Sequence, residues 1–190
     1  MTRQSRWVCV GILGVVIISL VERQTVNPRY ASVHGEMGQK AQRKKQWRRA
    51  EKYYQQAVQD DPFFADGFYR LGLLYKRRAD YPQAAEYLQR AVAMQPMLAE
   101  AFDQLGLTLL ALGAYPRARL AFEKALALNA GDIDRRKHVI MACWKMQDEA
   151  EAQTQLHHLR VYHAEALADQ LQTLSPVDRE RLITMEWQKI

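Results

Sequence analysis

The chain contains two similar stretches of sequence: "GFYRLGLLYKRRADYPQAAEYLQRAVAMQP" at Gly67–Pro96 and "AFDQLGLTLLALGAYPRARLAFEKALALNA" at Ala101–Ala130. The two copies are offset by 34 residues, and ten of the 34 positions are identical when the copies are aligned from Ala65 and Ala99. A repeat of this length with helical apolar spacing indicates stacked pairs of helices. The sequence therefore predicts an all-α fold.

Each copy has the composition of two amphipathic helices joined by a tight turn. Phe68, Leu71 and Tyr75 are spaced to share one face of a first helix, and Ala84 and Leu88 to share one face of a second. We expect these two faces to pack against each other.

The residues between the helices fit a close helical hairpin. Gly72 and Ala84 are small where the helices are expected to cross. Asp80 is placed to cap the second helix, and Pro82 falls in its first turn, where no backbone N–H is missed. Pro96 ends the unit.

This pattern resembles the tetratricopeptide repeat, whose 34-residue signature runs from an aromatic through Leu-Gly, Tyr, Ala, Phe and Ala to Pro. The resemblance implies an α-solenoid over residues 31–163, with copies at 31–64, 65–98 and 99–132 and a degenerate copy at 133–163. Terminal copies of a stack are expected to be atypical.

The C-terminal part, residues 164–190, is predicted to be a helical extension. No Gly or Pro interrupts the sequence from the fourth copy to Leu174, so we expect one long helix there. Ser175 and Asp178 then have the spacing of a capping box that starts a short helix. Ile183, Trp187 and Ile190 share a face of that helix and are the predicted docking residues.

The N-terminus contains an uncharged apolar stretch, Trp7 to Val21, after the cytoplasmic residues 1–6 and before a linker at 22–30. We interpret it as a transmembrane signal anchor, because no small-x-small cleavage site follows it; a cleaved secretory signal is the alternative. Arg3 and Arg6 favour a cytoplasmic N-terminus. The repeats would then lie on the exported, periplasmic side of a single-pass inner-membrane protein.

Charge is unevenly distributed along the chain, with a basic front and an acidic tail. Such asymmetry can indicate nucleic acid, anionic lipid or an acidic partner, or simply a solvated surface. The exported topology argues against nucleic acid. We therefore interpret the basic cluster as membrane-proximal; it comprises Lys40, Arg43, Lys44, Lys45, Arg48 and Arg49.

The sequence offers no recognisable chemistry. His157 and His158 are adjacent and point to different helix faces, and His34 and His138 each occur alone in the sequence. Glycine-rich phosphate loops and nucleophile motifs are missing, and Cys9 and Cys143 lack metal-binding spacing. We expect no enzymatic activity, cofactor, metal or small-molecule substrate.

The resemblance implies that the second, fifth, ninth and twelfth positions of each copy line the inner surface of the stack. In this chain they give an apolar floor with an acidic edge, suited to a partner's helix or extended peptide; the alternative is that some of them pack inside the chain or under its own C-terminal helix. The expected groove residues are Asp66, Tyr69, Leu73, Lys76, Glu100, Asp103, Leu107, Leu110, Lys137, Met141 and Trp144.

These features predict a membrane-anchored protein-interaction scaffold that holds or assembles a membrane or periplasmic complex. One alternative is an accessory subunit of a membrane enzyme or electron-transfer complex that clamps an extrinsic protein. Another is an assembly factor for a pilus, for secretion or for cytochrome maturation.

Overall fold

The computed structural model describes the backbone of residues 26–162 and 164–188 and the side chains as far as residue 185. This part of the chain is entirely helical apart from its connections, which confirms the all-α prediction. It falls into two compact units, of which the first ends at Phe64 and the second begins at Ala65.

The first unit contains one helical hairpin, α2 (Pro28–Arg43) and α3 (Trp47–Asp60). Tyr54 is fully buried between the helices and donates a hydrogen bond to Gln42 Oε1 at 2.8 Å. At the open end, the backbone N–H of Asn27 donates to the carbonyl of Asp60. The hairpin is therefore closed by polar contacts around a small apolar centre.

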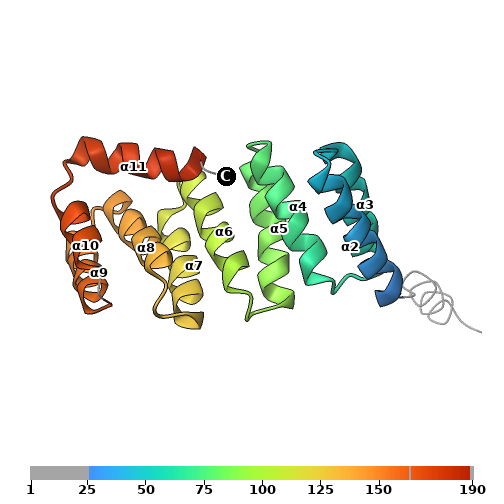
Figure 1. The fold of residues 1–190 in the computed structure, drawn as a ribbon, viewed down its shortest axis with the longest axis horizontal. Coiled ribbons are helices and arrows are strands. Elements are labelled where there is room, and N and C mark those ends of the chain that lie inside the picture. The colour runs from blue at the N-terminus through green and yellow to red at the C-terminus, as the bar shows by residue number, and fades with distance from the viewer. Residues whose placement is uncertain (1–25, 163, 189–190) are drawn as a thin grey trace, which may run out of the picture. The chain divides into compact units, whose positions relative to one another are not determined.

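The second unit consists of three hairpins and a C-terminal segment, with the helices labelled in Figure 1. The hairpins pair α4 (Ala65–Arg77) with α5 (Tyr81–Met94), α6 (Ala99–Ala111) with α7 (Tyr115–Leu128), and α8 (Ile133–Lys145) with α9 (Glu149–Val161). The segment adds α10 (Glu165–Gln172) and α11 (Pro176–Gln188).

The sequence period recurs in the structure at the positions where two helices cross. Ala50, Ala84, Ala118 and Ala152, which are 34 residues apart, are all fully buried. Gly38, Gly72 and Gly106 pack against Tyr54, Leu88 and Phe122 respectively, so closely that a Cβ would come within 3.0 Å of each neighbour. Small residues thus set the distance between the helices of a hairpin.

The same period governs the turn inside each hairpin. Lys45, Ala79, Gly113 and Gln147, again 34 residues apart, all have φ between 57° and 73°. This left-handed conformation is strained for every residue except glycine, yet only one of the four is glycine. The corner geometry is therefore imposed by the packing of the helices rather than by the local residue.

The expected caps form. Asp80 Oδ1 accepts a hydrogen bond from the backbone N–H of Gln83 at 3.3 Å, and Asp148 caps α9 in the same way. Ser175 Oγ accepts from the backbone N–H of Asp178 at 3.2 Å, as the capping-box spacing predicts.

The expectation of one long helix through the fourth copy to Leu174 was wrong. The helix stops at Val161, and α10 starts at Glu165 and packs back against α9. Ala168 and Leu171 are buried in the hydrophobic core by this reversal. A straight helix would have carried both side chains past the end of the stack, where no apolar surface remains to cover them.

Candidate partner-binding surface

The first helices of the three hairpins in the second unit form one face of the stack. α4 contacts α6, and α6 contacts α8, whereas α5 and α7, the second helices of neighbouring hairpins, share no comparable contact. A stack whose first helices approach one another more closely than its second helices is curved toward the first helices. We call the surface of α4, α6 and α8 the inner face.

The part of the inner face formed by α4 and α6 is open. Tyr69 and Leu73 are half-buried, and the side chain of Glu100 is 61% exposed. Burial raises the pKa of the Tyr69 hydroxyl, the nearby Arg70 guanidinium lowers it, and the carboxylates of Glu100, Asp103 and Asp66 raise it further. This surface thus combines an aromatic ring with three nearby carboxylates, which pair with Arg70, Arg135 and His138.

A buried polar network runs from α4 through α6 to α8 beneath that surface. Lys76 is 6% exposed, and its Nζ donates to Gln104 Oε1 at 2.7 Å. Burial lowers the pKa of Lys76 to about 7, and the charge of Asp103 offsets part of that shift. Asp103 Oδ1 also lies 2.8 Å from His138 Nδ1. The network links the three first helices through polar side chains.

The rest of the expected groove floor is buried, in contrast to the expectation of exposed positions. The floor residues of α6 and α8 are at most 8% exposed and belong to the hydrophobic core: Leu107, Leu110, Met141 and Trp144. Because these side chains are packed in the core, they are not accessible to a partner in this structure.

The end of the inner face formed by α8 is contacted by α11, which lies beyond the upper end of α8 in Figure 1. Ile183 is 1% exposed and lies in the same core cluster as the buried floor residues. The Arg179 guanidinium lies 4.6 Å from the centroid of the Trp144 ring, and its Nη1 donates to Glu149 Oε2 at 2.9 Å. Lys145 forms an ion pair with Glu180. The chain's own C-terminal helix therefore fills this end of the inner face.

Other predicted site residues lie on α4, α8 and α11. Asp66 pairs with Arg70 on α4, and Lys137 pairs with Asp134 on α8, close to the edge of the inner face. Of the predicted docking residues, Ile183 packs in the core, while the side chain of Trp187 and all of Ile190 lie outside the described residues. Sequence reasoning missed Arg179 and Glu180, although their spacing relative to Ile183 places all three on one side of a helix.

The basic cluster lies in the first unit, at the end of α2, in the turn and at the start of α3. All six side chains are exposed. Arg49 donates hydrogen bonds to the hydroxyl of Tyr53, and together with Lys40 and Lys44 it lines a shallow pocket of about 250 Å³. The structure thus concentrates positive charge on one turn of this hairpin.

The histidines and the described cysteine have structural surroundings. His34 Nδ1 lies 2.6 Å from Asp60 Oδ2, so His34 and His138 each have an aspartate partner on another helix. Cys143 is buried, and desolvation raises the pKa of its thiol to about 11. Among residues 26–162 and 164–188, no group of three or more His, Cys, Asp or Glu side chains is arranged to hold a metal ion.

Repeated helical hairpins with an interrupted inner face define an α-solenoid of the kind used for holding proteins. The tetratricopeptide-repeat family model matches residues 36–96 and 69–133, which together cover just over half of the chain. The chain belongs to the tetratricopeptide-repeat family. Proteins of this family generally mediate protein–protein interactions, and their fold is not typically catalytic.

Solved structures share this fold at low sequence identity. The crystal structure of MamA has a TM-score of 0.66 and 21% identity, covering 74% of this chain and 82% of that one. The first repeat domain of Spaghetti (RPAP3), bound to the HSP90 peptide SRMEEVD, has a TM-score of 0.61 and 20% identity, covering 64% and 97%. The Sgt2 domain from Aspergillus fumigatus has a TM-score of 0.59 and 21% identity, covering 67% and 87%. No curated protein sequence matches significantly.

The helices of the described ranges, 26–162 and 164–188, are all too short or too polar to cross a bilayer. The expected anchor at residues 7–21 lies outside those ranges, as do Cys9 and the cytoplasmic residues 1–6.

Proposed function

We propose that this protein is an interaction scaffold that holds a partner segment on the open part of its inner face, between α4 and α6. The observation that carries the proposal is the combination of half-buried Tyr69 and Leu73 with the exposed carboxylate of Glu100. An aromatic and an aliphatic side chain supply apolar contact, and the carboxylates select positive charge. The partner we infer is an apolar segment that carries at least one lysine or arginine.

The charge of this surface separates the chain from a relative that binds an acidic peptide. Spaghetti (RPAP3) was solved with the peptide SRMEEVD. In this chain Asp66, Glu100 and Asp103 lie near Tyr69. Arg70, Arg135 and His138 pair with these carboxylates, but the side chain of Glu100 is still 61% exposed and would repel an acidic tail. The peptide SRMEEVD is therefore expected not to bind, whereas a matched peptide with lysines in place of its glutamates is expected to bind.

The partner itself can be captured by placing a photo-crosslinking amino acid at Glu100 in the full chain, with Gln170 on α10 as the control position. A partner that crosslinks at the first position only is then purified. We expect Tyr69→Ala and Glu100→Lys each to weaken its binding about tenfold, because an interface aromatic commonly contributes more than 1 kcal/mol. Undiminished binding to both variants, with the helical circular dichroism unchanged, would refute the inner-face assignment.

The proposal extends to location and role. The uncharged stretch from Trp7 to Val21 supports a membrane anchor, and the exposed cations of the first unit would favour anionic headgroups. Extraction of the full chain from membranes by detergent, but not by alkaline carbonate, would be the expected result. Stoichiometric co-purification with an enzyme would favour the accessory subunit, whereas transient crosslinking would favour the assembly factor.

A further inference from the structure

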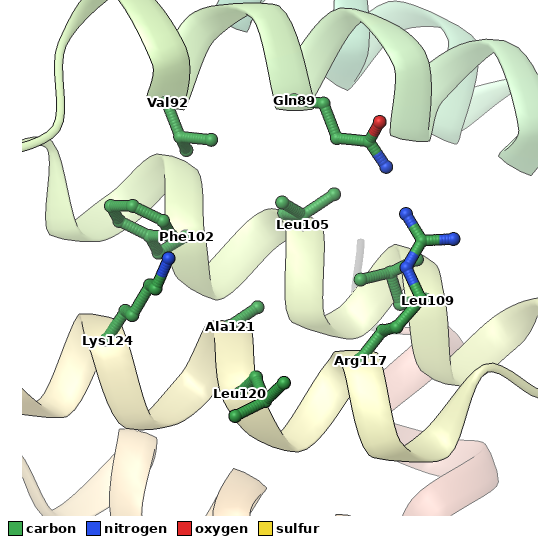
Figure 2. A pocket seen from close by; sticks show the side chains of 9 residues that line it. All are labelled: Gln89, Val92, Phe102, Leu105, Leu109, Arg117, Leu120, Ala121 and Lys124. Atoms are coloured by element: carbon green, nitrogen blue, oxygen red, sulfur yellow. The ribbon is translucent and has the colours of Figure 1, made fainter.

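A second candidate surface lies on the opposite side of the stack, where the second helices α5 and α7 are separated. The gap contains a pocket of about 230 Å³ whose floor is formed by Phe102, Leu105 and Leu109 of α6. Figure 2 shows Leu105 at the centre, with Gln89 and Val92 of α5 on one side and α7 on the other. We call this feature the α5–α7 groove.

The wall formed by α7 has a regular pattern. Arg117, Leu120 and Lys124 are spaced i, i+3 and i+7, so they follow one side of the helix over about two turns, or roughly 10 Å. Figure 2 places the two cations at opposite ends of the pocket. Leu120 lies beside the pocket and is 54% exposed. The groove therefore has an apolar centre between two positive charges.

These two cations differ from most others in the second unit. Arg70, Arg90, Arg119 and Arg135 each have an acidic partner within the chain. Neither Arg117 nor Lys124 forms an ion pair with any side chain in the described part of the chain, and the pocket lining contains no carboxylate. Lys124 Nζ instead lies 5.6 Å from the centroid of the Phe102 ring. The positive charge of the groove is thus left uncompensated beside apolar surface.

We propose that the α5–α7 groove binds an acidic amphipathic helix of a protein partner, with apolar side chains against Leu120 and Val92, above the buried floor residue Leu105, and carboxylates at Arg117 and Lys124. The pocket is smaller than the roughly 300–1,000 Å³ of typical small-molecule sites. It suits one or two anchoring side chains from a larger partner. Carboxylates seven residues apart on the partner helix would reach both cations. This surface is separate from the inner face and does not depend on the function proposed there.

The test uses the full chain and three stapled helical peptides labelled with fluorescein. Each has leucines on one face, flanked by two residues seven positions apart, which are glutamate, glutamine or lysine. Fluorescence anisotropy should show that the glutamate peptide binds the native chain more tightly than the glutamine peptide does. Arg117→Glu with Lys124→Glu should weaken the glutamate peptide at least tenfold. The same double variant should bind the lysine peptide more tightly than the native chain does.

Three further variants locate the binding. Lys52→Glu with Arg181→Glu changes the net charge equally at exposed positions outside the groove and should leave the affinity unchanged. Leu120→Ser should weaken binding, since it removes apolar contact at an exposed position without opening the core. Tyr69→Ala should have no effect, because Tyr69 belongs to the inner face.

Equal affinity for the glutamate and glutamine peptides, or no loss in the charge-reversed variant, would overturn the proposal. Binding of vesicles of phosphatidylserine and phosphatidylcholine, lost in the charge-reversed variant, without binding of any peptide would also overturn it. That outcome would assign the groove to a lipid surface instead.

Discussion

Replacing Gly106 by alanine tests whether the contact between α6 and α7 sets the geometry of the central hairpin. A Cβ at Gly106 would lie less than 3.0 Å from three ring carbons of Phe122, whose side chain is fully buried. Overpacking of this kind costs about 1–3 kcal/mol. Alanine in a helix interior is favoured over glycine by about 1 kcal/mol. The net expectation is a loss of up to about 2 kcal/mol in the free energy of unfolding.

The assay is urea unfolding of the full chain, followed by far-UV circular dichroism. Gly131→Ala is the control for a Cβ that meets no atom within 4 Å; its unfolding midpoint should not fall. Adding Phe122→Leu to Gly106→Ala should recover part of the loss, since leucine is the residue that faces Gly72 in the preceding hairpin. The double variant should therefore be more stable than the sum of the single effects implies.

The sign of the result decides between packing and helix propensity. If propensity alone mattered, Gly106→Ala would stabilise the chain by about 1 kcal/mol. Stabilisation, or strict additivity with Phe122→Leu, would refute the view that the small residue holds the two helices close together.

Two further predictions concern the corner of a hairpin and the buried lysine. Gly113→Ala should lower the free energy of unfolding by about 1 kcal/mol, because its φ of 73° is strained for alanine. Ala79→Gly at the equivalent corner should not destabilise the chain. The urea unfolding midpoints of both variants check these expectations. Lys76 has a folded pKa of about 7, below the ordinary value of 10.5, so between these values the unfolded state binds the additional proton and stability should rise with pH. Lys76→Met should remove that rise. The urea midpoints of the native chain and the variant are compared at pH 7 and at a higher pH, and the difference between them should change with pH. A difference that is the same at both pH values would show that Lys76 stays charged when folded.

The hairpins were predictable because the residues that specify them repeat. Ala84 and Ala118 at the crossings, and Asp80 as a cap, have local signals that one sequence displays directly. The reversal between α9 and α10 has no such signal, since neither glycine nor proline marks it. It follows from the need to bury Ala168 and Leu171, and that need depends on where the stack ends.

The candidate surfaces were less predictable than the fold. Family geometry placed Met141 and Trp144 on the inner surface, but which of these residues reach solvent depends on α11, whose docking rests on Ile183 and Arg179 far along the chain. The α5–α7 groove was missed because its floor and walls come from three helices. Its only local signal is the spacing of Arg117, Leu120 and Lys124, which also fits an ordinary solvated helix face.

The left-handed corner of each hairpin limits the insertions and deletions that the chain can accept. It falls at Lys45, Ala79, Gly113 and Gln147. An insertion of one or two residues inside a hairpin would rotate every later side chain about its helix and bring a different residue to the corner. Inserting or deleting a complete 34-residue repeat changes neither the orientation of the later side chains nor the residue at each corner. Size variation among close homologues is therefore expected in increments of complete hairpins, with odd-length insertions confined to the connections between them.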